Sequence, residues 1–169
     1  MRLFFYGTLR DPEVRRTVFG GRAHDLAVRP AVLPGFQANR ARAGDFPVLV
    51  RRTGARTPGA LVEGVRRGDL LRLFNFEGPH YVPARHLVID EEGRRLAAWV
   101  LLPDHPRRAS AEPWRLRRWQ LYRKPRVMPR VRLWVREFDR VGSSSVEIAW
   151  TVRRQLAAWR DAGELADEF

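Results

Sequence analysis

The chain has 169 residues, 44% of them hydrophobic, so it is long enough to bury a core and is expected to form one domain over residues 1–169. It has no cysteine, which excludes disulfides and thiolate chemistry, and its four histidines lack metal-ligand spacing, so we expect no metal and no cofactor. No apolar run approaches the roughly 20 residues of a membrane span, and the first run is too short for a secretory signal, so a cytoplasmic location without membrane association is expected.

The formal net charge of +13 raises the question of a nucleic-acid partner. The excess lies in residues 15–67, with eleven arginines against three acidic residues, and in residues 105–140, with twelve basic residues against three acidic ones. Lys124 is the single lysine, and such a preference for arginine is more typical of coding bias than of a phosphate-binding surface. A solvated basic surface is therefore favoured over a nucleic-acid partner. Binding of RNA or another polyanion by a non-catalytic protein remains the alternative.

The first residues predict a strand, a turn and a helix. The apolar run Leu3–Tyr6 ends at Gly7, and Asp11-Pro12-Glu13 supplies an acidic N-cap, a proline at the first helical position and an acid in the first turn. The helix should end at Gly20-Gly21. A strand-turn-helix entry directs backbone N–H groups towards one point, so this turn could bind an anion.

The next segment predicts extended structure with one break. Ala31–Arg40 is expected to be extended, with an interruption at Pro34-Gly35, and Phe46–Val50 and Ala60–Val65 are expected to be short strands. Between these strands, residues 51–59 contain two glycines and a proline and are predicted to form a loop.

A compact helix follows, and its end is of chemical interest. Asp69 is the expected N-cap, and the helix should end before Gly78-Pro79. Its buried face is expected to carry Leu70, Leu73 and Phe74. Glu77 would then lie in the last turn among apolar residues, where both the helix dipole and desolvation raise the pKa of a carboxylate. This placement predicts a carboxylate suited to act as a base.

The remainder predicts a hairpin and then helices. Strands His80–Asp90 and Arg94–Leu102 are joined by a short turn, and Gly142–Ser145 is expected to break the helical part. The first helix, from Ser110 onward, is expected to place on one side Trp114, Leu121 and Tyr122. The apolar stripe of the second helix is Val127, Val131, Trp134, Val135 and Phe138, and that of the last is Ile148, Val152, Leu156 and Trp159.

Three separated stretches resemble the gamma-glutamylcyclotransferase-like family, which includes plant avirulence-induced-gene proteins and gamma-glutamylamine cyclotransferases. They are Phe4–Leu9 (FFYGTL), Phe46–Val50, and Glu63-Gly64 followed by Leu73–Tyr81 with Glu77-Gly78 at its centre. The resemblance covers about residues 2–102. Residues 110–138 are similar to the Trp-rich helical extension of bacterial members.

The resemblance implies an α+β fold, with a small mixed β-barrel over residues 1–102, helices around its mouth, and a helical extension over residues 103–169 packed on it. It implies release of 5-oxoproline from a small gamma-glutamyl substrate, without a cofactor. Glu77 aligns with the family's catalytic glutamate. The substrate-binding candidates are Tyr6, Gly7, Thr8, Leu9 and Tyr81.

Several alternatives stay open. Glu77 could be only a surface carboxylate at the end of a helix. Tyr6 could instead cap the barrel core, and Tyr81 could be a packing residue, since an aromatic side chain at the start of a strand commonly belongs to the core. Trp114, Trp119 and Trp134 could stack on bases, although helical periodicity favours packing of the extension onto the barrel. The sequence identifies neither the leaving amine nor whether the chain forms a homodimer.

Overall fold

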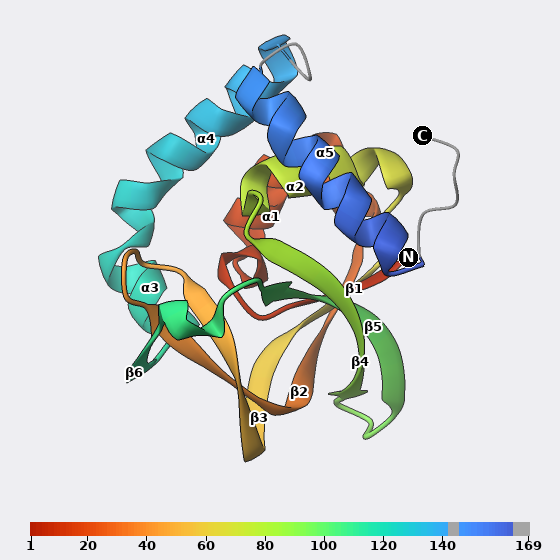
Figure 1. Cartoon of the computed structure of the whole chain (residues 1–169), viewed down its shortest axis with the longest axis vertical. Coiled ribbons are helices and arrows are strands. Elements are labelled where there is room, and N and C mark those ends of the chain that lie inside the picture. Colours follow the sequence, from red (N-terminus) through yellow and green to blue (C-terminus); the bar gives the residue numbers. More distant parts are fainter. Residues whose placement is uncertain (142–145, 164–169) are drawn as a thin grey trace.

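Six β-strands form the lower half of the molecule, and most of the helices gather at one end of them (Figure 1). The computed structural model describes residues 1–141 and 149–163 in full and the backbone of residues 146–148. The strands are β1 Arg2–Phe5, β2 Ala27–Ala41, β3 Pro47–Glu63, β4 Tyr81–Asp90, β5 Arg95–Pro103 and β6 Ala109–Pro113. The α-helices of the described part are α1 Pro12–Phe19, α2 Arg67–Glu77, α3 Leu116–Tyr122, α4 Lys124–Val141 and α5 Val146–Asp161, and short 3₁₀ helices span Thr8–Arg10, Gly20–Asp25 and Pro106–Arg108.

The first five strands close into a barrel. They follow the order β3-β1-β5-β4-β2, and β2 pairs again with β3, so the sheet has no open edge between them. The β1–β5 pair is parallel and the other pairs of the barrel are antiparallel, which makes the barrel mixed. Strand β6 pairs with β2 outside the closed barrel. The expected α+β fold with a small mixed barrel is therefore confirmed.

Strands β2 and β3 form one long hairpin, and the predicted loop over residues 51–59 is wrong. These residues belong to β3, and Thr57 and Gly59 pair with Leu33 and Ala31 of β2. The irregularity that Pro34-Gly35 predicts is present, as a register shift between Pro34 and Phe36. Pro34 and Gly35 are accommodated in β2 by this bulge, and Gly59 is accommodated in β3 by close packing against β1.

Gly59 is needed where β3 passes the β1 aromatic residues. A Cβ atom at Gly59 would lie 2.2 Å from Phe4 Cζ and 2.7 Å from the Phe5 carbonyl oxygen. Because the backbone oxygen cannot move aside, Gly59→Ala is expected to destabilise the protein by about 3 kcal/mol in urea unfolding. Gly21→Ala is the control, since nothing lies within 4 Å of its Cβ position, and it should change stability by less than about 0.5 kcal/mol. Equal stability of the two variants would contradict this packing.

Helix α1 begins and ends as its sequence predicts. The Asp11 side chain accepts hydrogen bonds from the backbone N–H groups of Glu13 at 2.9 Å and Val14 at 3.2 Å. The helix then ends at Gly20, whose φ of 58° suits glycine.

Helix α2 has its expected buried face but a different cap. Leu70, Leu73 and Phe74 are fully buried. The prediction of Asp69 as N-cap is wrong, because the helix begins earlier and its N-cap is Arg66. Asp69 lies in the first turn, where its carboxylate accepts a hydrogen bond from the Arg66 backbone N–H at 2.8 Å. The helix ends at Glu77, with Gly78 as C-cap, as predicted.

The chain after residue 103 departs from the sequence prediction at its start. Residues 110–113 belong to strand β6, and helix α3 begins only at Leu116. Leu121 and Tyr122 are exposed, and Trp119 is the buried residue of this helix. The prediction is therefore wrong for Leu121 and Tyr122, whereas Trp114 precedes the helix and packs partly buried against the core.

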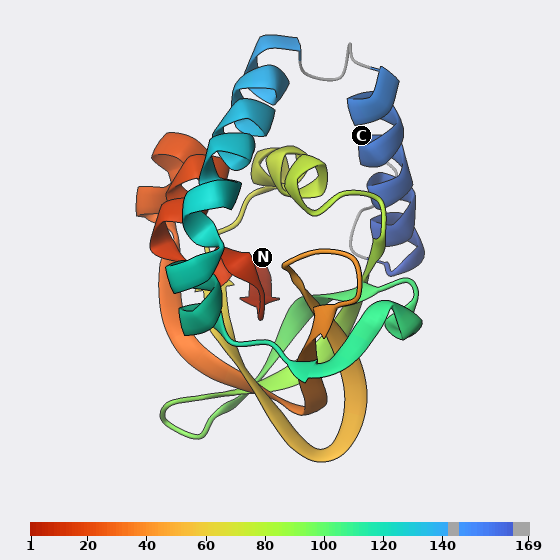
Figure 2. The ribbon, with the colours of Figure 1, turned by 90° about the vertical axis from the view of Figure 1, so that its left-hand side faces the viewer.

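Helices α4 and α5 lie on opposite sides of α2 (Figure 2). In α4, Val131 is buried as predicted, whereas Trp134 is 51% exposed and does not pack on the barrel. In α5, Val152 and Trp159 are buried as expected. The predicted break at 142–145, the side chain of Ile148 and the end of the chain from 164 lie outside the described residues. None of the helices described is long and apolar enough to cross a membrane.

Candidate active site

A pocket lies where the end of β1, the turn after it and the end of α2 meet. Its cavity volume is about 40 Å³. The lining residues are Phe4, Phe5, Tyr6, Gly7, Thr8, Leu9, Phe46, Pro47, Glu77, Tyr81 and Leu101. The structure thus brings all six sequence-predicted site residues to one place, although Glu77 and Tyr81 are about seventy residues from the others in the chain.

The turn after β1 lines this pocket and contains backbone N–H groups without a partner among the described residues. Thr8–Arg10 form a short 3₁₀ helix, in which Arg10 N donates to Gly7 O at 3.1 Å and Asp11 N donates to Thr8 O at 2.9 Å. The backbone N–H groups of Thr8 and Leu9 donate to no other described residue, as is usual for the first N–H groups of a helix. Such N–H groups can bind a carbonyl oxygen or an anion.

Helix α2 places Glu77, its last residue, in the wall of the pocket. The helix is fixed by its buried face, and the Gly78 N–H closes its last turn by donating to Phe74 O at 2.9 Å. Burial raises the pKa of the Glu77 carboxyl group from its ordinary value of 4.5 to about 7.

No residue of the described part of the chain neutralises the charge of Glu77. The sequence has 32 basic residues, and most of the described carboxylates form ion pairs with them. Glu77 forms neither an ion pair nor a hydrogen bond with any residue in the described part of the chain. A carboxylate that is both desolvated and unpaired is a proton acceptor of the strength that catalysis at neutral pH requires.

Tyr6 and Tyr81 surround this carboxylate with neutral hydroxyl groups. Burial raises the pKa of each phenol, and the nearby Glu77 raises both further. The Tyr6 hydroxyl donates to Leu101 O at 2.8 Å, so Tyr6 is both a core residue and a wall of the pocket. The Tyr81 hydroxyl has no hydrogen-bond partner among the residues described, which leaves it available to a ligand.

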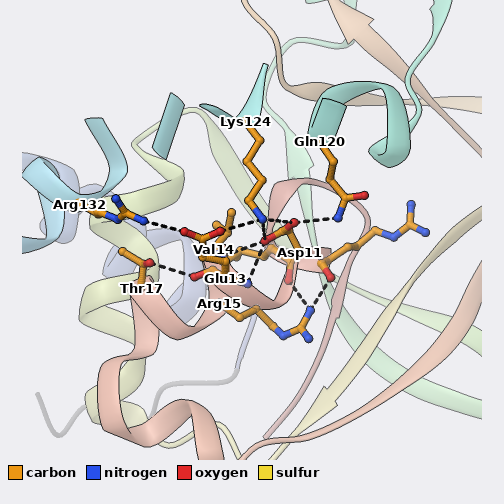
Figure 3. A network of polar contacts seen from close by, with 10 residues as sticks. Asp11, Glu13, Val14, Arg15, Thr17, Gln120, Lys124 and Arg132 are labelled. Atoms are coloured by element: carbon orange, nitrogen blue, oxygen red, sulfur yellow. Dashed lines mark hydrogen bonds and ion pairs between the residues drawn. The ribbon is translucent and has the colours of Figure 1, made fainter. Parts of the chain in front are cut away.

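A polar network joins Asp11, directly after the turn, to α3 and α4 (Figure 3). Asp11, which caps α1 and is only 1% exposed, receives hydrogen bonds from Lys124 Nζ at 2.9 Å and from Gln120 Nε2 at 2.8 Å. Arg15 Nη1 donates to the carbonyls of Leu9 and Arg10 at 2.8 and 2.6 Å. The sole lysine of the chain therefore ties the start of α4 to the residue that follows the site turn.

Sequence reasoning missed part of the pocket and all of its support. Phe46 and Pro47 precede and begin β3, and Leu101 is on β5, so their places in the pocket depend on strand pairing. A Cβ atom at Gly7 would lie 3.1 Å from Pro47 Cγ, which shows how closely that wall approaches the turn. A lysine that stands alone among arginines was the one signal that could have indicated the network around Asp11.

The chemistry of the pocket follows from these groups. Glu77 shares a pocket with a phenol and with two backbone N–H donors that have no partner among the described residues, and this combination is suited to moving a proton beside a polarised carbonyl group. No cluster of side chains that could hold a metal ion occurs within residues 1–141 or 149–163.

Comparisons with known proteins place the chain in a family. The family model described as gamma-glutamyl cyclotransferase, AIG2-like, matches residues 3–121. The comparison with curated proteins gave no match.

Solved structures of similar proteins share the fold. Two Arabidopsis thaliana proteins, At5g39720.1 and At3g28950.1, align with TM-scores of 0.55 and 0.57 at 23% and 19% identity. The alignments cover 76% and 88% of this chain, and 86% and 89% of theirs. The uncharacterized protein PH0828 from Pyrococcus horikoshii aligns with a TM-score of 0.52 at 17% identity, over 72% of this chain and 93% of its own. The match of the family model over most of its length shows that the chain belongs to the gamma-glutamyl cyclotransferase, AIG2-like family.

Proposed function

We propose that the protein is a cyclotransferase that releases 5-oxoproline from a gamma-glutamyl amine or amino acid, with Glu77 as general acid and base. The observation that carries the proposal is the position of Glu77, unpaired and with a raised pKa, in the same pocket as the Tyr6–Leu9 turn. Membership of the family supports the substrate class. No cofactor enters the reaction as proposed.

The reaction begins with a proton transfer. The α-ammonium group of the substrate must lose a proton before its nitrogen can attack, and Glu77 accepts that proton. A carboxylate of ordinary pKa is a weak base towards an ammonium group. A pKa of about 7 for Glu77 lies closer to the pKa of the ammonium group, so the proton transfer is less unfavourable.

Ring closure and release follow. The α-nitrogen attacks the γ-carbonyl carbon, a C–N bond forms, and negative charge develops on the carbonyl oxygen. The N–H groups of Thr8 and Leu9 are the donors assigned to that oxygen, and the Tyr81 hydroxyl is assigned to the glutamyl group. The bond to the leaving nitrogen then breaks. Overall the α-nitrogen loses two protons and the leaving nitrogen gains two, so Glu77 carries protons between them and ends as it began.

A panel of substrates tests this function. The wild-type protein is incubated with gamma-glutamyl amines and gamma-glutamyl dipeptides, and 5-oxoproline is measured by chromatography. At least one compound is expected to give 5-oxoproline and an equal amount of free amine. Absence of product from the whole panel would reject the proposed activity.

The pH dependence of the reaction should follow the protonation state of Glu77. Since the base must be unprotonated, kcat/KM is expected to rise about tenfold per pH unit below the Glu77 pKa of about 7 and to level off above it. The measurement is a pH–rate profile on the best substrate of the panel. A bend near the ordinary glutamate pKa of 4.5, or no bend at all, would remove Glu77 from this role.

A further inference from the structure

Gln155 of helix α5 reaches the turn that carries Glu77. Its side-chain Nε2 donates to two backbone carbonyls, Gly78 O at 2.6 Å and Tyr81 O at 3.0 Å. Gln155 is only 1% exposed, and α5 lies beside α2 (Figure 2). The two carbonyls stand at either end of the connection from α2 to β4, directly after Glu77.

The chemistry of the amide accounts for a glutamine at this position. A primary amide nitrogen has two N–H groups, so one side chain can serve both carbonyls. Gly78 O belongs to the end of a helix, where carbonyl groups lack intrahelical partners. The neighbouring buried positions Val152 and Trp159 of α5 are apolar, and Gln155 Oε1 is buried without a partner among the residues that the structure describes. Burial of the amide oxygen without a partner is unfavourable. The two hydrogen bonds donated by the amide nitrogen are therefore the favourable contacts of Gln155.

These contacts fix two walls of the pocket together. Glu77 immediately precedes Gly78, and Tyr81 lines the pocket with its side chain while its carbonyl is held by Gln155. Gly78 has a φ of 76° and no neighbour within 4 Å of its Cβ position, so the turn has little packing of its own. Without the amide, this turn would keep the buried face of α2 and the last helical turn, but it would lose the two side-chain hydrogen bonds to its carbonyl groups.

We propose that Gln155 is a positioning residue for Glu77, and that helix α5 is thereby part of the active site although it lies beyond the residues matched by the family model. The expected effect of Gln155 on kcat rests on the proposed function. Gln155 touches neither substrate nor reacting atoms. It acts by holding the backbone on which the carboxylate and the Tyr81 ring are placed.

The test compares Gln155→Leu, which keeps the bulk but removes both donors, with Thr151→Val, a buried control one turn earlier on α5. A displacement of about 1 Å at a catalytic group can cost on the order of 10²-fold in rate, so Gln155→Leu is expected to lower kcat by about that factor while KM changes little. The Glu77 carboxyl group, followed by carbon NMR, should titrate below its wild-type midpoint because water reaches the loosened turn. Thr151→Val should match the wild type in both measurements.

Each outcome decides the proposal. A folded Gln155→Leu protein with wild-type kcat and an unchanged Glu77 titration would overturn it, because a purely structural residue would lower only the unfolding temperature. If that variant does not fold, Gln155→Asn is compared with the wild type in the same two measurements, since its shorter side chain cannot reach both carbonyl groups. If the wild type releases no 5-oxoproline from any substrate, the proposed function fails, but the NMR titration of Glu77 still decides whether Gln155 positions it.

Discussion

Glu77→Gln is expected to lower kcat/KM for 5-oxoproline release by roughly 10²- to 10⁴-fold, the usual contribution of a positioned general acid or base. Glutamine keeps the size of the side chain but cannot take a proton from the α-ammonium group. The substrate should still bind, because the Tyr6–Leu9 turn is unchanged, so the loss is expected mainly in kcat. Steady-state rates of 5-oxoproline release at saturating and at limiting substrate separate the effect on kcat from the effect on KM.

Glu91→Gln is the matched control. Glu91 is an exposed carboxylate in the turn between β4 and β5, and its replacement should leave kcat/KM within about twofold of the wild type. Full activity in Glu77→Gln would show that another group carries the proton.

Glu77→Gln should not destabilise the fold, so a loss of activity in this variant can be distinguished from a loss of structure. Burial raises the pKa of Glu77 in the folded protein, so its charged form opposes folding and stability falls as pH rises through about 7. Glu77→Gln should therefore be more stable than the wild type at about pH 8, by roughly 1 to 3 kcal/mol, and this difference should shrink towards about pH 5. Thermal unfolding at the two pH values measures it.

Lys124→Met is expected to lower the free energy of unfolding by roughly 3 kcal/mol, because it leaves the buried Asp11 carboxylate without its cation. Burial alone would raise the pKa of Asp11, but the hydrogen bonds from Lys124 and Gln120 outweigh it and hold that pKa below its ordinary value. Removing Lys124 turns this stabilisation into a cost. Urea unfolding at neutral pH gives the difference.

Arg118→Met is the control for a surface ion pair. Arg118 pairs with Glu112, but its side chain is 69% exposed, so its loss should cost less than about 1 kcal/mol. The double variant Asp11→Asn with Lys124→Met should recover part of the stability, since asparagine can still cap α1 and carries no charge. If Lys124→Met were no more destabilising than Arg118→Met, the network in Figure 3 would be marginal to the fold.

The parts of the site that follow from local sequence could be predicted. The cap at Asp11, the stop of α2 after Glu77 and the burial of Leu70 and Phe74 all depend on residues within one or two turns of each other. The raised pKa of Glu77 also follows locally, because its apolar neighbours and its position at a helix end act in the same direction. That the YGTL turn and Glu77 share a pocket came from the family resemblance, since nothing local relates residues seventy apart.

The parts that depend on distant pairing could not be predicted. Gly54 and Gly59 suggest a loop by themselves, yet β2 pairs with residues 47–51 and 56–63 of β3, and Phe4 requires the space that Gly59 leaves. Strand β6 exists because β2 has a free edge there, which the helical pattern after Ser110 does not show. The Gln155 contact joins a side chain to backbone groups more than seventy residues away, and no sequence pattern marks it.

The most direct test of the central claim follows the atoms of the substrate. A gamma-glutamyl compound with heavy nitrogen in its α-amino group is incubated with the wild-type protein in water containing heavy oxygen, and the products are analysed by mass spectrometry. Intramolecular attack predicts 5-oxoproline that retains the heavy nitrogen in its ring and contains no heavy oxygen. Glutamate carrying heavy oxygen would instead show hydrolysis, and it would contradict the cyclisation that Glu77 and the Tyr6–Leu9 turn are proposed to perform.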